Sequence, residues 1–400
     1  INLSKLKIIE EKNLEAEKVL EDCYKNCDEK GRLKILFELA YLNRSLGNLE
    51  KSRYYTNEIL KIDKYEPFAH KLLSSLRTYK KGDLHIKQLE EIIKLKSNIQ
   101  TNFDNYYFAL GKAYEDTNQF DLSAKNYLKG NLSKKKNSKN VLSEFKILTD
   151  SIYSFFDSFD FDKFDISYKS EKKIIFICSM PRSGSTLTEQ IISAHKDVHA
   201  TGENNYLSKI IINNYCKNVM LDNHKILNDL NLSKNYIAKE YLKNFLSVKN
   251  SYKVFTDKTY QNFLWIGFIK IFFPNSIVIN CLRNPKDVCF SIFKNTFNDS
   301  GMDWAYDQND IATYYNIYSE MIKFWNKIIP NFIINLDYDL LITNPESEIK
   351  NLINNCELNW DDNCLNHHKN KNIINTTSNV QVRKKIYTSS KNSYLNYESH

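Results

Sequence analysis

Apolar residues in the first 130 positions recur at intervals of three and four, which is the spacing of one helix face. The segment shows no strand-like alternation, and its pattern repeats with a period of about 34 residues. An earlier unit carries Leu36, Leu39, Ala40 and Gly47 and ends at residues 61–63, and a looser one surrounds residues 81–83. The unit that fits best starts at Asp104 and carries Tyr107, Leu110, Gly111, Tyr114, Ser123 and Tyr127. We therefore expect an N-terminal domain of stacked helical repeats.

The order of large and small residues in these units resembles that of tetratricopeptide (TPR) repeats, in which small residues let two helices approach each other. Such a stack implies a concave surface for a peptide or a partner protein. It is equally compatible with a helical cap that stabilises the rest of the chain or holds it in a homodimer. No anchor residue in the sequence decides between these two interpretations.

The helical pattern ends near residue 130. Residues 131–138 are polar, include Lys134, Lys135 and Lys136, and predict a solvated loop. Residues 154–169 mix Phe with Asp without a clear period. We expect a junction here, with helical repeats over residues 1–150 and a second domain over residues 151–400.

Short apolar runs alternate with amphipathic segments after the junction. This alternation predicts a parallel sheet with helices on both faces, and hence an α/β fold. In such folds, ligands bind at the carboxyl ends of the strands, where Arg182, Lys258 and Arg283 fall. The predicted strands cover residues 173–179, 252–255, 276–282 and 332–336, and the predicted helices cover residues 262–273, 285–294, 309–329 and 346–355.

The first of these strands leads directly into the loop Pro181–Thr186 and then into a helix. This arrangement turns backbone N–H groups and a helix N-terminus toward one point, which favours an anion. Gly184 permits the tight turn, while Arg182 adds a fixed positive charge. The loop is P-loop-like but departs from the triphosphate-binding pattern, because Ser179 stands at the first glycine position and Ser185 at the lysine position. A triphosphate with magnesium is therefore disfavoured.

The composition is ordinary for a globular chain with a modest positive charge. Hydrophobic residues make up 42% and charged residues 26% of the chain, and the formal net charge is +8. A basic chain attracts anionic ligands such as nucleotides. No run of Lys and Arg is interleaved with aromatic residues, so nucleic acid is not expected as a partner. No stretch of about 18 apolar residues predicts a membrane span.

The eight cysteines form no C-x-x-C pair, and Cys178, Cys281 and Cys289 lie in apolar stretches where a free thiol packs as a small hydrophobe. Reduced thiols predict a reducing compartment, so we expect a cytoplasmic protein. No signal peptide is expected, although the chain begins at Ile1 without Met, which leaves an upstream segment open. No cluster of His, Cys and Asp has metal-ligand spacing, so no metal is expected.

Several motifs in a fixed order resemble the tyrosylprotein sulfotransferases and the bacterial repeat-containing sulfotransferases. The resemblance covers roughly residues 30–398 and rests on six pieces of sequence. They are the loop Pro181–Thr186, Gly202-Glu203, Asp257-Lys258, Arg283 with Ser291 eight residues later, Tyr338 seven residues before Pro345, and the C-terminal segments Val380–Arg383 and Ile386–Ser390.

This resemblance implies a sulfotransferase that takes a sulfuryl group from 3′-phosphoadenosine-5′-phosphosulfate (PAPS) and passes it to a hydroxyl acceptor, on a peptide or a small molecule, with a protein tyrosine among the candidates. It implies that Glu203 is the catalytic base and that Lys258 and Arg182 stabilise the leaving phosphate. It also implies that the co-substrate is bound by Arg182, Ser183, Gly184, Ser185, Thr186, Arg283, Ser291, Tyr338, Ser389 and Ser390.

The residue types suit this chemistry independently, because sulfuryl transfer, like phosphoryl transfer, depends mainly on positioning and on charges that stabilise the leaving oxygen. Two other hypotheses stay open: an ATP-dependent kinase, which would need magnesium, and a non-catalytic repeat scaffold that binds a nucleotide. Arg383, Lys384 and Lys385 either clamp the 3′-phosphate or form a basic loop. After Ser390 the family pattern has Gly-Arg-Trp, whereas this chain has Asn392-Ser393-Tyr394, so we expect its C-terminal loop to close differently.

Overall fold

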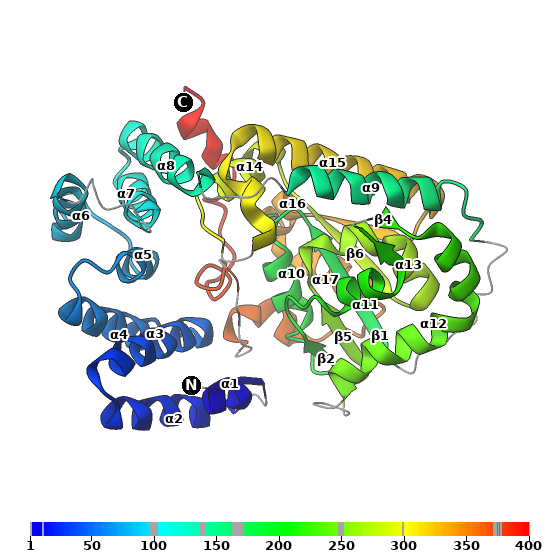
Figure 1. The fold of residues 1–400 in the computed structure, drawn as a ribbon, viewed down its shortest axis with the longest axis horizontal. Helices are drawn as coiled ribbons and strands as arrows, with labels where there is room; N and C mark the ends of the chain where they lie inside the picture. The colour runs from blue at the N-terminus through cyan, green and yellow to red at the C-terminus, as the bar shows by residue number, and fades with distance from the viewer. Residues whose placement is uncertain are drawn as a thin grey trace.

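The computed structural model describes residues 2–9, 12–95, 103–136, 141–161, 172–218, 220–246, 252–297 and 300–370, together with residues 374, 376 and 378–399. A stack of helices forms the N-terminal part, and an α/β domain follows it (Figure 1). The C-terminal segment runs back between these two parts. No helix of the described chain has the length and apolar character that crossing a membrane requires. Each of the eight cysteines is free of a disulfide.

The N-terminal stack confirms the helical prediction for the first 130 residues. Helices α3 and α4 pack against each other, as do α7 and α8. A Cβ atom at Gly111 of α7 would lie 2.5 Å from Cε1 of Tyr127 in α8, so only glycine lets these two helices come so close. That the units are TPR repeats stays a prediction. The helices are α1 (Asn2–Ile9), α2 (Asn13–Asn26), α3 (Glu29–Leu46), α4 (Leu49–Ile62), α5 (Pro67–Ser75), α6 (Leu84–Leu95), α7 (Asp104–Asp116), α8 (Phe120–Lys135) and α9 (Leu142–Phe156).

The loop predicted for residues 131–138 is wrong over most of its length, because α8 continues to Lys135. Residues 137 and 138 lie outside the described chain. Tertiary contacts explain the extension: the Asn131 amide donates to the Phe293 carbonyl at 2.8 Å, and Lys135 forms an ion pair with Asp310 of the α/β domain. These polar residues therefore join the two parts of the molecule.

The α/β domain is built on a five-stranded parallel sheet, as the strand–helix alternation predicted. Its strands are β1 (Lys173–Ser179), β2 (Val198–Ala200), β5 (Val254–Asp257), β6 (Ile277–Leu282) and β7 (Ile333–Asp337), in the order β2-β5-β1-β6-β7. The strands on either side of β1 come later in the chain. The loop after β1 therefore lies where the chain order reverses, which is the usual ligand position in such sheets. A separate antiparallel pair joins β3 (Cys216–Lys217) and β4 (Met220–Leu221).

Helices cover both faces of this sheet, so β1 is apolar on both sides. Phe176 packs into the larger core together with Trp325 and with Phe156 of α9, whereas Ile175 and Ile177 pack into the core on the opposite face. Helices α9 and α15 lie side by side over one face (Figure 1). The helices of this domain are α10 (Ser185–Ile192), α11 (Tyr206–Tyr215), α12 (Asn223–Leu246), α13 (Ile266–Phe272), α14 (Pro285–Phe293), α15 (Gln308–Ile328), α16 (Tyr338–Thr343) and α17 (Pro345–Asn355), with 3₁₀ turns η1 (Tyr260–Trp265), η2 (Ser300–Tyr306), η3 (Asp362–Lys369) and η4 (Ser393–Tyr397).

Two buried histidines in the helical stack make its stability depend on pH. His70 and His85 are hydrogen-bonded through Nδ1 and Nε2 at 2.9 Å, and the Tyr79 hydroxyl lies 2.7 Å from Nδ1 of His85. Burial lowers the pKa of His85 to about 3, well below that of an unfolded histidine near 6.5. Between these two pKa values the unfolded chain binds more protons than the folded chain does. The contribution of neutral His85 to the free energy of unfolding is therefore fully present above pH 6.5 and decreases as the pH falls.

We expect the protonation of His85 to lower the free energy of unfolding by about 2 kcal/mol between pH 7 and pH 5. The His85→Gln variant keeps a hydrogen-bonding side chain but cannot titrate, so its loss over the same interval should be smaller by about that amount. Urea unfolding followed by circular dichroism at both pH values measures the difference. Equal pH dependence in the native protein and the variant would contradict the prediction.

Candidate functional site

The loop after β1 is held in a conformation that turns backbone groups toward the N-terminus of α10. Arg182 has a φ of 72° and Gly184 a φ of 97°, so the residues on either side of Ser183 lie in the left-handed region. This conformation costs a non-glycine residue about 1–2 kcal/mol, and such strain is common at functional sites. At Gly184 the Tyr338 ring approaches so closely that a Cβ atom would collide with it. Glycine is therefore required there for both reasons.

The Arg182 side chain connects three segments of the chain. Its Nε donates to Oγ of Ser291 in α14 at 3.1 Å, Nη2 donates to Oε1 of Gln381 at 2.8 Å, and Nη1 bonds to the Ser378 hydroxyl. Burial, reinforced by the Arg283 charge, lowers the pKa of Arg182 to about 10. Two guanidinium groups thus share one partly buried place, which favours an anion between or beside them.

Arg283 follows β6 and fixes both the loop and the C-terminal segment. Its Nη1 donates to the Arg182 carbonyl at 3.1 Å, and Nη2 donates to the Ser390 carbonyl at 2.6 Å. The guanidinium lies over the Tyr338 ring, 4.8 Å from its centroid, and the Tyr338 hydroxyl is 3.2 Å from Oγ of Ser390. Its Nε is buried and has no hydrogen-bond partner among the described residues. One donor therefore stays available for a ligand oxygen.

These residues surround a small pocket of about 60 Å³ at the carboxyl ends of β1, β6 and β7. Gly184, Ser185 and Thr186 line it from the loop, and the C-terminal segment lines it from the other side with Ser378, Gln381, Val382 and residues 384–387. Ser183 is buried and is not part of its lining, and Ser389 is exposed beside a neighbouring cleft. Of the predicted nucleotide residues, Arg182, Arg283, Ser291, Tyr338 and Ser390 are brought into direct contact with one another.

The two other predicted catalytic residues form a separate pair at the ends of β2 and β5. The Lys258 ammonium group donates to Oε1 of Glu203 at 2.6 Å. The Lys258 side chain is only 1% exposed, whereas the Glu203 side chain is 48% exposed. The backbone N–H of Lys258 donates to the Gly202 carbonyl at 3.0 Å, which fixes the two loops together. A buried ammonium group and a solvent-accessible carboxylate therefore form a direct pair.

Comparison with protein-family models assigns this part of the chain. Residues 175–362, which contain β1 from its third residue, all the later strands and the loops just described, match the sulfotransferase family. These residues are a sulfotransferase-family domain. The chain is 24% identical over 206 residues to a candidate protein-tyrosine sulfotransferase of Caenorhabditis briggsae, a match that covers 50% of this chain and 70% of that protein.

Over nearly its whole length the chain is also 30% identical to an uncharacterised protein of Aquifex aeolicus, with 99% of this chain covered but only 53% of the relative. The chain thus spans about half the length of that relative. Among solved structures, the sulfotransferase domain of the Synechococcus PCC 7002 olefin synthase matches with 16% identity and a TM-score of 0.43, over 57% of this chain and 89% of that one. The sulfotransferase domain of the curacin biosynthetic pathway matches with 16% identity and a TM-score of 0.39, over 56% of this chain and 90% of that one.

The sulfotransferase domain also contains two buried carboxylates close to the Glu203–Lys258 pair. Oε1 of Glu189, a residue of α10 that is 3% exposed, accepts from the Gly202 N–H at 3.1 Å and from the Thr256 hydroxyl at 2.8 Å. Burial raises the pKa of Glu189, and the nearby Lys258 charge opposes that rise. Glu189 has no distinguishing signal in the sequence, because an acidic residue in a short amphipathic helix has the pattern of a surface position.

The contacts of Asp257, the second of these carboxylates, are those of a structural residue. It is 1% exposed and accepts hydrogen bonds from the Tyr241 hydroxyl at 2.6 Å and from the Asn262 amide at 3.0 Å. The Thr259 N–H donates to the same carboxylate at 3.1 Å. Asp257 therefore holds the end of β5 in place and so positions the next residue, Lys258.

The C-terminal segment is fixed by an aspartate at the start of α14. Asp287 is fully buried, and its carboxylate accepts from the Asn392 N–H at 2.8 Å, the Tyr394 N–H at 3.4 Å and the Ser393 hydroxyl at 3.3 Å. The divergent Asn-Ser-Tyr sequence thus supplies backbone and hydroxyl donors to one carboxylate. This contact holds Ser390 beside the site.

Arg383 answers one of the questions that the sequence left open. Its Nη2 donates to the Ser45 carbonyl at the end of α3, at 2.5 Å, and its Nη1 donates to the Asn370 carbonyl at 3.2 Å. Arg383 therefore ties the C-terminal segment to the helical stack. Lys384 and Lys385 instead line the site.

We expect the Asp287→Asn substitution to loosen the C-terminal segment, because an amide group would present a donor to donors that now meet a carboxylate, with a loss of about 1–3 kcal/mol. Limited proteolysis should cut within residues 388–399 faster than in the native protein, and nucleotide should bind more weakly because the Arg283–Ser390 contact depends on this segment. Asp150→Asn, at an exposed position of α9, is the matched control. An unchanged cleavage rate in Asp287→Asn would contradict the assignment.

Proposed function

We propose that the chain transfers a sulfuryl group from PAPS to a hydroxyl acceptor. The observation that carries this proposal is the arrangement of two groups along one edge of the sheet. Arg182 and Arg283 lie beyond β1 and β6, and the Glu203–Lys258 pair lies beyond β2 and β5. A cationic nucleotide site thus adjoins a carboxylate–ammonium pair.

The residues beyond β1 and β6 suit a nucleotide with a 5′-phosphosulfate and a 3′-phosphate. The loop at Gly184 and the N-terminus of α10 provide backbone donors for an anion. Arginine binds phosphate oxygens through two parallel hydrogen bonds, and the buried, unpartnered Nε of Arg283 is an available donor. We assign the 5′ end to the loop and the 3′-phosphate to Arg283 and Ser291. PAPS supplies the activated sulfuryl group.

Glu203 and Lys258 are proposed to divide the transfer step between them. The Glu203 carboxylate accepts the proton of the acceptor hydroxyl while the hydroxyl oxygen forms a bond to sulfur. Because a phenol has a pKa near 10 and a carboxylate near 4, this proton moves late, when bond formation has already acidified the hydroxyl. The bond between sulfur and the 5′-phosphate oxygen breaks, and Lys258 together with Arg182 stabilises the negative charge that this oxygen gains.

The acceptor is proposed to be a hydroxyl compound, with peptide tyrosine as the first candidate. The relative in Caenorhabditis briggsae, described as a candidate protein-tyrosine sulfotransferase and aligned with 50% of this chain, supports this choice. A partner protein or a second copy of the chain at the helical repeats, and a cytoplasmic location, stay predictions. Cross-linking and cell fractionation would test them.

Binding of adenosine 3′,5′-bisphosphate, the nucleotide product, tests the proposal against an ATP-dependent kinase. Isothermal titration calorimetry with and without magnesium, beside ATP, is the measurement. We expect binding that needs no metal and exceeds that of ATP. The Arg283→Ala variant should bind about ten to a hundred times more weakly, because it loses hydrogen bonds from a charged donor.

Two results would overturn the proposal. Preference for ATP with magnesium would favour the kinase, and no binding of either nucleotide by the native protein would rule out a function that uses PAPS. Arg283→Lys is the companion variant, since it keeps the charge but loses the paired donors. Its affinity should lie between those of the native protein and Arg283→Ala.

A further inference from the structure

A cleft of about 990 Å³ lies between the helical stack and the sulfotransferase domain. One wall comes from α3, α4, α5, α7 and α8, and the other contains Arg283, Ser291 and the C-terminal segment. Several residues, including Arg182 and Tyr338, line both this cleft and the small pocket. The two spaces therefore adjoin. The volume is at the upper end of the range for small-molecule sites, about 300–1,000 Å³.

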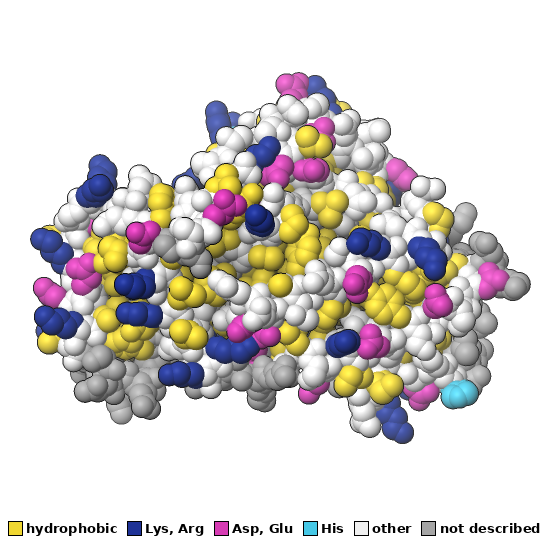
Figure 2. All heavy atoms as spheres, turned by 90° about the horizontal axis from the view of Figure 1, so that it is seen from above, with side chains coloured by type: hydrophobic (Ala, Val, Ile, Leu, Met, Phe, Trp, Pro, Cys, Tyr) yellow, Lys and Arg dark blue, Asp and Glu magenta, His cyan; other side chains and the backbone are white. Residues whose placement is uncertain are grey.

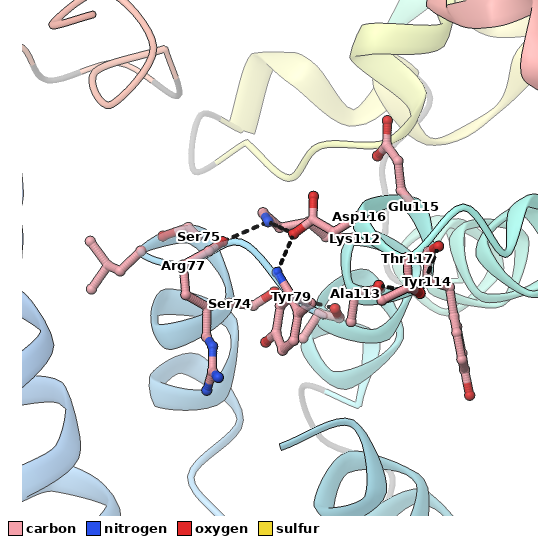
Figure 3. A network of polar contacts seen from close by, with 12 residues as sticks. Ser74, Ser75, Arg77, Tyr79, Lys112, Ala113, Tyr114, Glu115, Asp116 and Thr117 are labelled. Atoms are coloured by element: carbon pink, nitrogen blue, oxygen red, sulfur yellow. Dashed lines mark hydrogen bonds and ion pairs between the residues drawn. The ribbon is translucent and has the colours of Figure 1, made fainter. Parts of the chain in front are cut away.

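The described lining of this cleft is strongly cationic, with ten lysine or arginine residues against two acidic ones. Both acidic residues are already paired. Glu115 accepts from the Lys294 ammonium group at 2.6 Å. Asp116 accepts from the Lys112 ammonium group at 2.5 Å and from the Tyr79 N–H at 3.0 Å (Figure 3). On the outer face seen in Figure 2, by contrast, charges of both signs are interspersed. The cleft therefore carries an excess of positive charge that its own acidic residues do not balance.

Arg44 and Lys71 are the cations of the helical wall that lack an ion pair among the described residues. Arg44 has a buried Nε with no hydrogen-bond partner there. The Lys71 ammonium group donates to the Thr296 hydroxyl at 3.2 Å and lies 4.4 Å from the centroid of the Phe108 ring. Burial lowers the pKa of Lys71 to about 7; Asp104 opposes this change and Arg44 adds to it. An anion beside these two residues would remove their mutual repulsion.

The position of the cleft indicates which anion it receives. Arg283 and Ser291, assigned above to the 3′-phosphate, line it, whereas Glu203 and Lys258 do not. A molecule in the cleft thus meets the nucleotide side of the site and not the acceptor side. A nucleoside bisphosphate carries several negative charges, which matches the excess of cations.

We propose that the helical stack is part of the nucleotide site, with Arg44 and Lys71 attracting and holding the phosphate-bearing end of the co-substrate and of its bisphosphate product. This inference rests on the proposed function and extends it. The helices would then bind the nucleotide, rather than a peptide or a second copy of the chain, which were the alternatives that the sequence left open. Arg44 and Lys71 act through their charge, because they line the helical wall of the cleft whose other wall carries Arg283 and Ser291.

The test compares two double variants of the full chain that each lose two positive charges. Arg44→Met with Lys71→Met changes the cleft, while Lys18→Met with Lys87→Met changes exposed residues of α2 and α6 that do not line it. Calorimetry measures the affinity for adenosine 3′,5′-bisphosphate and for AMP. We expect about tenfold or greater weakening of bisphosphate binding in the cleft variant, less weakening for AMP, and a change below twofold in the control.

Three outcomes separate the possibilities. Bisphosphate affinity within twofold of the native value in the cleft variant would refute the inference and leave the proposed function intact. Weakened binding of an acidic tyrosine peptide with unchanged nucleotide affinity would also refute it, since the cleft would then serve the acceptor. Failure of the native protein to bind bisphosphate would instead refute the proposed function. Lys71→Met alone provides a second variant if the double change unfolds the chain, and its expected weakening is about threefold or more.

Discussion

Replacement of Lys258 by methionine should lower the rate of sulfuryl transfer by about a hundredfold to a thousandfold, the usual effect of losing a donor that stabilises transition-state charge. The Lys258 side chain is almost fully enclosed and points its ammonium group at Glu203, 2.6 Å away. Water therefore cannot replace it readily. Nucleotide affinity should change little, because the contacts of Arg182 and Arg283 do not involve Lys258.

The measurement is the single-turnover rate with radiolabelled PAPS and the best acceptor from a screen of tyrosine peptides and phenols. Glu203→Gln is the companion variant: it keeps the shape of the side chain but removes the base, and should slow transfer by about 10²–10⁴-fold. If Lys258→Met retained more than a tenth of the native rate at unchanged nucleotide affinity, Lys258 would not be the residue that stabilises the leaving oxygen.

The sequence predicted the central part of the sulfotransferase domain well because its signals are local. The apolar run before the loop predicted β1 with the same bounds as in the structure, and β6 begins one residue later than expected. Continuous apolar runs bounded by polar residues need no long-range information to be recognised. The same is true of the loop at Gly184, where strand, glycine and helix follow one another directly.

Features that depend on tertiary contacts were not predicted. Helix α8 extends through polar residues because Asn131 and Lys135 find partners in the sulfotransferase domain. The roles of Asp287 and Arg383 depend on a segment that returns from the end of the chain, about 100 residues after Asp287 and more than 300 residues after Ser45. No periodicity in a single sequence indicates which distant backbone group such a side chain will meet.

The pairing of Glu203 with Lys258 shows which features of the candidate site sequence motifs can predict and which they cannot. The sequence placed Lys258 at the end of a strand and singled out Glu203 only through the family resemblance, and the structure brings the two together at the neighbouring strands β5 and β2. The sequence could not indicate the hydrogen bonds that hold the loop of Glu203 and the end of β5 in place. The Thr201 hydroxyl donates a hydrogen bond to the carbonyl of Thr256 in β5 at 2.5 Å. This contact holds the short loop that carries Glu203.

Glu189 is the centre of that support, and its replacement by alanine should reduce the free energy of unfolding by about 3–5 kcal/mol, as is typical when one member of a buried charged network is removed. Two donors, the Gly202 N–H and the Thr256 hydroxyl, would lose their acceptor, and the enclosed Lys258 would lose a neighbouring negative charge. Urea unfolding at neutral pH measures the change. Glu144→Ala, at an exposed position of α9, is the control and should change stability by less than about 0.5 kcal/mol.

Glu189→Gln separates the hydrogen bonds from the charge, because its amide oxygen still accepts from both donors while the carboxylate charge is lost. If the hydrogen bonds dominate, this variant should be nearer to the native protein in stability than Glu189→Ala is. It should then also keep more of the transfer activity, because Gly202 and Glu203 stay in place. If the charge dominates, the two variants should be equally unstable. Alanine and glutamine variants both within 1 kcal/mol of the native protein would show that the Glu203 loop holds its place without Glu189, and that α10 contributes to the site only through its N-terminus.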